Sequence, residues 1–154
     1  MLTTLFKTDV YVAQYPDISN FESIVEDILQ HLPFSTYINE VMSNCPPFPP
    51  GIESTVCHWF KNDPKHPPEI LHKDPRFVAI AEWITEHAKI YWQEIGYSAR
   101  YEPEIEKSWI QRYHGQCHGL HVHNHPGMPL SASFYFDGSP EQGNFVVEDP
   151  LDLL

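Results

Sequence analysis

The apolar residues of this chain change their spacing near residue 100. Before that point two segments, 19–33 and 74–96, carry apolar side chains every three or four residues, which is the period of an amphipathic helix. Beyond it the spacing falls to two, the period of a β-strand, over consecutive short segments. Helices that precede a run of strands indicate an α+β fold with a mostly antiparallel sheet or barrel.

The two helical segments have recognisable ends. In the first, Ser19 and Glu22 have the spacing of a capping box, and Pro33 ends the helix. The second is expected to start at Asp74-Pro75, an N-cap residue followed by proline at the first helical position, and to stop at Gly96. The apolar stripes are Phe21, Ile24, Val25, Ile28 and Leu29 in the first helix and Phe77, Ile80, Ala81, Ile84, Ala88, Tyr91 and Ile95 in the second.

Extended and irregular segments complete the predicted layout. An opening strand is expected over 1–14. The Pro-rich region 44–75 is expected to be mostly irregular, with 44–51 as a stiff surface loop rather than a polyproline ligand. The later strands are predicted at Ser108–His114, Leu120–His125, Leu130–Phe136 and Asn144–Glu148.

Length and charge limit the classes of protein that fit. With 154 residues the chain fits one domain, with an N-terminal helical support over 1–100 and a β-core over 101–154. It has no apolar run long enough to cross a membrane and no signal peptide, so a cytoplasmic protein is expected. The net charge of -12 disfavours binding to nucleic-acid backbones and anionic membranes. Three cysteines without a Cys-x-x-Cys pair predict no disulfide framework.

The most unusual segment is Leu120–His125, in which histidines alternate with other residues. In a strand, His121, His123 and His125 project from one face. Two residues apart on a strand, imidazoles have Cβ atoms ~7 Å apart and can bind one metal ion. Neutral histidine is a common metal ligand. The alternative interpretation is a solvated stripe of histidines without a metal.

The residues around these histidines have a specific order. Trp109 precedes them, His123-Asn124-His125-Pro126-Gly127 is followed by an aromatic strand that contains Ser131, and the segment 143–150 ends in Asp-Pro. This pattern resembles the 2-oxoglutarate- and iron(II)-dependent oxygenases found widely in marine bacteria and phages. The resemblance is specific over 109–150 and faint before it. It implies a double-stranded β-helix, that is, a jelly-roll or cupin-like barrel, with the N-terminal helices packed on it.

The resemblance also implies roles for individual residues. His123 is the first iron(II) ligand, and His125 takes the place of the carboxylate in the more familiar His-x-Asp arrangement. His121 replaces one of them if the strand register shifts by two. Ser131 and Tyr135 are the candidate binding residues for the 2-oxoglutarate cosubstrate, although Tyr135 also fits a core aromatic with a bonded hydroxyl. The implied reaction is oxidative: the keto acid is decarboxylated and a substrate that the sequence does not name is hydroxylated.

The chain departs from this family at its C-terminal end. Family members carry further strands with a distal histidine ligand and a basic residue for the far carboxylate of the cosubstrate. Here no histidine follows His125, and no lysine or arginine follows Arg112. We therefore expect the β-helix to be incomplete at its C-terminus and the metal site to be short of a ligand.

Three other interpretations fit parts of the sequence. A cupin-like metal-binding protein without 2-oxoglutarate chemistry would use the same histidines. A zinc-stabilised interaction module would combine Cys117 with His121 or His123, although the spacing matches no standard zinc finger. A non-catalytic interaction module would use the Pro-rich loop 44–51 to bind a partner. A homodimer is compatible with each of them.

Overall fold

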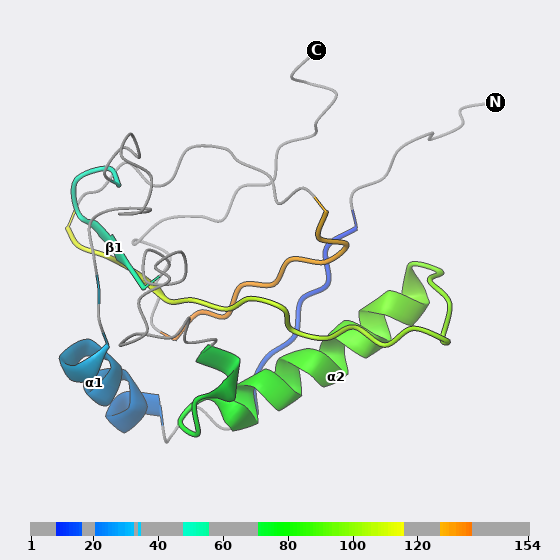
Figure 1. Ribbon diagram of the computed structural model, residues 1–154, viewed down its shortest axis with the longest axis horizontal. Helices are drawn as coiled ribbons and strands as arrows, with labels where there is room; N and C mark the ends of the chain where they lie inside the picture. Colours follow the sequence, from blue (N-terminus) through cyan, green and yellow to red (C-terminus); the bar gives the residue numbers. More distant parts are fainter. Residues whose placement is uncertain are drawn as a thin grey trace, which may run out of the picture.

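Helix α2 (Val78–Glu94) is the longest described element of the computed structural model, and the other described segments lie around it (Figure 1). The structure describes residues 9–16, 21–32, 34, 48–55, 71–115 and 127–136. In chain order the elements are helix α1 (Phe21–His31), strand β1 (Ile52–Ser54), the short 3₁₀ helix η2 (Leu71–Lys73), α2 and strand β2 (Gln111–Tyr113). Contacts with α2 place the segments 9–16, 102–110 and 130–136, and pairing with β2 places β1.

Helix α1 confirms the first predicted helix. It begins at Phe21, two residues after the predicted cap, and its last residue is His31, two residues before Pro33. Proline has no N–H and disfavours a helical conformation of the residue before it, so a helix ends ahead of it. Ile24 packs against the core from α1, and Leu32 is buried just beyond its end.

The second helix begins three residues later than predicted. Asp74 does bind the backbone N–H of Arg76 with its side chain, at 3.0 Å, as an N-cap residue does. However, residues 75–77 form a turn, and the α-helix starts only at Val78. The N–H groups of Asp74 and Phe77 each bond to the carbonyl three residues back, at 2.9 Å. This is the tighter 3₁₀ pattern, which delays the start of the α-helix.

The predicted glycine closes the C-terminal end of α2. Gly96 has a φ of +88°, in the left-handed region that residues with a Cβ rarely adopt. The Gly96 N–H donates to the Gln93 carbonyl at 3.0 Å. The Tyr97 N–H donates to the Trp92 carbonyl at 3.0 Å, which completes a Schellman motif. The rings of Trp92 and Tyr97 stack with their centroids 4.1 Å apart and cover the motif.

Strand β1 lies in the Pro-rich region 44–75, which the sequence predicts to be mostly irregular. That prediction is wrong for Ile52–Ser54, which pairs antiparallel with β2. The register is Ile52↔Tyr113, Glu53↔Arg112 and Ser54↔Gln111. Three residues are too few to show a period, so no sequence pattern predicts this strand. In the structure it is distinguished by the burial of Ile52 and Ser54. β2 lies inside the predicted strand Ser108–His114 and is shorter than it.

The segment 9–16 lies along one flank of α2 (Figure 1). The hydroxyl of Tyr11 is 2.8 Å from Nδ1 of His87, within hydrogen-bond distance. The ring of Tyr15 meets that of Trp83 with centroids 5.3 Å apart. Because the later residue of the segment contacts the earlier residue of the helix, the two run antiparallel. The predicted opening strand is described only from residue 9, and there no β-ladder is assigned.

The segment 102–110 lies on another side of α2 and leads into β2. Glu102 pairs with Lys89, near the end of the helix, at 3.1 Å. Ser108 contacts His72, which precedes the helix, at 3.0 Å. This segment therefore also runs antiparallel to α2.

Residues 130–136 lie next to the segment 9–16 and also cover α2. Phe134 and Phe136 pack against the core, and the Phe134 ring lies 6.0 Å from that of Trp83. Tyr135 between them is 66% exposed, so side chains alternate between the helix and the outside as in an extended strand. The structure assigns no ladder pairing to this predicted strand, although the period of two is present.

The buried core lies between the helices and these segments. Its buried side chains come from the residue after α1, from the first residue of η2 and from the start of α2. Partly buried side chains from all three extended segments pack against them. The buried set is Leu32, Leu71, Phe77 and Ile80, and the partly buried set is Tyr15, Ile24, Phe34, Ile84, Ile110, Phe134 and Phe136. Ile80 and Ile84 belong to the predicted apolar stripe of the second helix, which is thereby confirmed for these positions.

The described part of the chain contains two α-helices and one antiparallel strand pair. Two predicted strands, Leu120–His125 and Asn144–Glu148, lie outside the described residues. The double-stranded β-helix and its division into a helical support and a β-core therefore stay predictions. Within the described ranges, neither helix has the length and hydropathy needed to span a bilayer.

An arginine ties α1 to the start of α2. The guanidinium of Arg76 lies 2.6 Å from a carboxylate oxygen of Asp27, in α1, and 2.6 Å from one of Asp74. Hydrogen bonds from Arg76 lower the pKa of both carboxyl groups. His31 lies 2.9 Å from Asp27 and adds to the effect there. Because the pKa of each is lowered by folding, their contribution to stability is complete above the ordinary pKa of 3.8 and is lost as the pH falls through the lowered pKa.

Replacing Arg76 with glutamine is expected to lower the melting temperature by about 2–4 °C near neutral pH, the effect of losing exposed ion pairs. The difference should shrink at an acidic pH below the lowered pKa values, where the carboxyl groups have lost their charge with the arginine as well as without it. Thermal unfolding followed by circular dichroism measures the melting temperatures of both proteins at each of the two pH values. Arg100→Gln, at an exposed position, is the matched control. An Arg76→Gln deficit of equal size at both pH values would contradict the assigned ion pairs.

Candidate functional site

The described residues flank the predicted metal site. The histidines expected to bind metal and the cysteine of the alternative zinc site, namely His121, His123, His125 and Cys117, lie outside the described residues. Gly115 precedes them and Gly127, the last residue of the His-x-His-Pro-Gly motif, follows them, with φ values of +59° and +83°. A Cβ at either glycine would meet no atom within 4 Å, so backbone conformation and not lack of space favours glycine there. The chain therefore turns on both sides of the predicted histidine strand.

The two predicted cosubstrate residues, Ser131 and Tyr135, are both exposed and lie on the side of their segment away from Phe134 and Phe136. The interpretation of Tyr135 as a core aromatic is wrong, because its side chain is 66% exposed. Four residues apart in an extended segment, the two side chains start ~13 Å from each other. They therefore cannot hold the same carboxylate. If both bind one cosubstrate molecule, they contact different parts of that molecule.

A charged cluster lies across β1 and β2, and β2 is close in sequence to the predicted histidine strand. Glu53 faces Arg112 in the ladder and accepts a hydrogen bond from its guanidinium. His114 lies 2.9 Å from the same carboxylate oxygen. The bond from Arg112 and then that from His114 lower the pKa of Glu53. The guanidinium also covers the ring of Phe34, 4.2 Å from its centroid.

This cluster holds Arg112 in place by pairing and by stacking, which gives the arginine a structural role. Sequence reasoning does not find it, because Glu53 and Arg112 are far apart in the chain and meet only through β1. No local sequence signal points to it, because the three-residue strand Ile52–Ser54 is too short to show a period.

His72 is held beside Ser108 ahead of α2. The Ser108 hydroxyl oxygen accepts the backbone N–H of His72 at 2.9 Å and lies 3.0 Å from the ring Nδ1. Since the hydroxyl has a proton to donate, Nδ1 accepts it and the ring proton is assigned to Nε2. Burial, followed by the charge of Lys73, lowers the pKa of His72, so the ring is neutral at neutral pH.

The other described histidines have packing or pairing partners as well. His87 contacts the Tyr11 hydroxyl and lies with its ring 4.3 Å from that of Trp83, and so joins the segment 9–16 to α2. Over the ranges that the structure describes, no three side chains of His, Cys, Asp or Glu come together as a metal site. The predicted metal site therefore depends on residues 121–125.

Comparisons with known proteins add no family to this description. No family model, curated protein or solved structure matches the chain significantly. The resemblance to the oxygenases rests on the motif between residues 109 and 150.

Proposed function

We propose that this chain belongs to an iron(II)- and 2-oxoglutarate-dependent oxygenase with the double-stranded β-helix fold, in which His123 and His125 are two of the iron ligands. The observation on which this depends is the order His123-Asn124-His125-Pro126-Gly127, followed by Ser131 and Tyr135. The substrate that is hydroxylated is not specified by these residues.

The described flanks support an extended histidine strand. The segments that end at Gly115 and begin at Gly127 both run antiparallel to α2, so the two glycines lie toward opposite ends of the helix (Figure 1). Residues 116–126 join them, and an extended chain of that length reaches ~36–40 Å. The 17 residues of α2 cover ~26 Å. The connection 116–126, which contains the proposed strand, is therefore long enough to run from one end of α2 to the other.

The donor set suits the metal. Neutral imidazoles bind iron(II), and two of them on one strand face leave positions for a third protein ligand and for the cosubstrate. When bound, iron(II) with 2-oxoglutarate and oxygen supplies the hydroxylation. The chain's own residues bind and orient: the exposed Tyr135 hydroxyl is a hydrogen-bond donor for the cosubstrate, while Phe134 and Phe136 anchor the same segment on the core.

Anaerobic addition of 2-oxoglutarate to the iron(II)-loaded protein tests this function. A visible absorption band is expected only when protein, iron and keto acid are present together, because the keto acid chelates the metal. Glutarate, which has the same five-carbon chain and both carboxylates without the keto group, is the matched control ligand and should give no band. Iron binding without the band would favour a cupin-like metal protein. Unfolding on addition of a chelator would favour the zinc-stabilised module that uses Cys117.

A further inference from the structure

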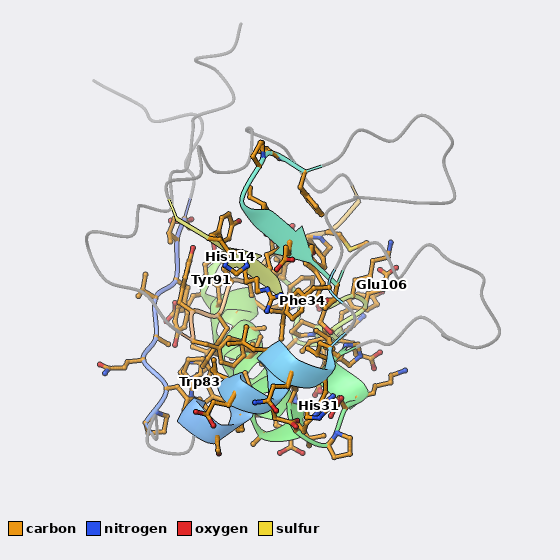
Figure 2. All side chains as sticks on the ribbon, turned by 90° about the vertical axis from the view of Figure 1, so that its left-hand side faces the viewer. His31, Phe34, Trp83, Tyr91, Glu106 and His114 are labelled. Carbon is orange, nitrogen blue, oxygen red and sulfur yellow. The ribbon has the colours of Figure 1, made fainter. Side chains whose placement is uncertain are left out.

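A groove with a volume of about 470 Å³ follows the flank of α2 where the segment 102–110 passes. Figure 2 shows Glu106, of this segment, on the side of the molecule away from Trp83, which contacts the segment 9–16. The groove therefore lies away from the side chains that pack α2 against that segment. Neither of the predicted cosubstrate residues, Ser131 and Tyr135, is among the described residues that line it.

The groove has an apolar floor. Val78 and Ala81 of α2 form one part of it and Ile105 of the facing segment forms another. Val78 is 37% exposed, and Ala81 and Ile105 are half-buried, so apolar surface is open to a ligand. Thr85, also in the groove, donates its hydroxyl to the Ala81 carbonyl at 2.8 Å, which satisfies that hydroxyl as a donor within the helix.

The rim of the groove is acidic. Three carboxylates, Glu82, Glu86 and Glu104, line it. Lys73 is the one permanent cation among the lining residues that the structure describes, and the His72 ring there is neutral. Glu86 shares Lys89, at 3.5 Å, with Glu102. Among the described residues, Glu82 and Glu104 have no basic partner within ion-pair distance.

We propose that this groove docks an extended segment of a partner protein through a lysine or arginine side chain. The aliphatic stem of such a side chain fits the apolar floor, and its cationic head reaches Glu82 and Glu104 at the rim. A nucleic acid or an anionic membrane would be repelled by the same carboxylates and by the net charge of -12. The volume is in the range of sites that hold a few side chains.

Fluorescence anisotropy with a labelled hexalysine peptide at physiological ionic strength tests the proposal on the full chain. The double variant Glu82→Gln/Glu104→Gln should weaken binding about 3- to 30-fold, the combined effect of two partly exposed ion pairs. The matched control is Glu26→Gln/Glu94→Gln, which removes the same charge at exposed positions outside the groove and should leave affinity within about 2-fold.

A second variant tests the floor without changing charge. Val78→Thr keeps the shape of the side chain and adds a hydroxyl, and it should weaken binding by about 2- to 3-fold. Circular dichroism confirms that each variant is folded. If hexalysine does not bind, or if the two double variants lose the same affinity, the interaction is absent or reflects net charge alone, and the docking groove is overturned. Binding unaffected by Val78→Thr would also overturn it, since the floor would then play no part.

Discussion

Replacing Phe77 with alanine is expected to lower the free energy of unfolding by about 3–5 kcal/mol. Phe77 is 5% exposed and lies in the buried cluster with Leu32, Leu71 and Ile80. Its ring also meets that of Phe136, with centroids 6.2 Å apart. The substitution removes apolar contacts on several sides and leaves a cavity that the surrounding elements fill only in part. A domain of this kind has a total stability of about 5–15 kcal/mol, so the loss is a large fraction of it.

Urea unfolding followed by tryptophan fluorescence measures this loss. Val78→Ala is the matched control, because Val78 is the next residue in the chain but is 37% exposed. Its expected cost is below ~1 kcal/mol. A similar loss in the two variants, or a loss below ~1 kcal/mol for Phe77→Ala, would show that the core does not lie where η2, α2 and the segment 127–136 meet.

Replacing either His123 or His125 with alanine is expected to reduce iron(II) affinity more than ~100-fold. Removal of a residue that only orients a metal ligand typically costs ~10–100-fold, and loss of a ligand itself should cost more. Anaerobic titration of the full chain with iron(II), followed by calorimetry, measures the affinity. His121→Ala distinguishes the two strand registers, because it should leave iron binding nearly unchanged if the His123–His125 pair is correct.

His114→Ala is the matched control for these titrations. His114 belongs to the same histidine-rich stretch of the chain, but its ring contacts Glu53. Its replacement should leave iron affinity within about 2-fold, as expected of a residue outside the metal site. Unchanged iron affinity in both His123→Ala and His125→Ala would remove the basis for the proposed oxygenase.

The helices could be predicted from the sequence because their signals are local. Apolar spacing and Pro33 locate α1, and Gly96 locates the end of α2 through its left-handed conformation. The start of α2 was displaced because the side-chain bond of Asp74 is equally compatible with a 3₁₀ turn. Local sequence signals do not distinguish the first turn of an α-helix from a 3₁₀ turn.

Strand β1, its pairing with β2 and the charged cluster on the pair could not be predicted, because they arise from long-range contacts. Ile52–Ser54 has too few residues for a period and lies between prolines, yet Ile52 is 1% exposed. The Glu53–Arg112 pair exists only once that strand is placed. By contrast, the alternation of exposed and partly buried side chains around Tyr135 follows from the local period of two. Whether this segment pairs with another strand depends on distant parts of the chain.

X-ray absorption at the iron edge of the anaerobic iron(II)-loaded chain tests most directly whether imidazoles from one strand share a metal ion. We predict scattering from two histidine rings in the unaltered chain, and its loss in the double variant His123→Ala/His125→Ala. An iron environment of oxygen ligands alone, or ring scattering that the double variant retains, would contradict the proposed metal site.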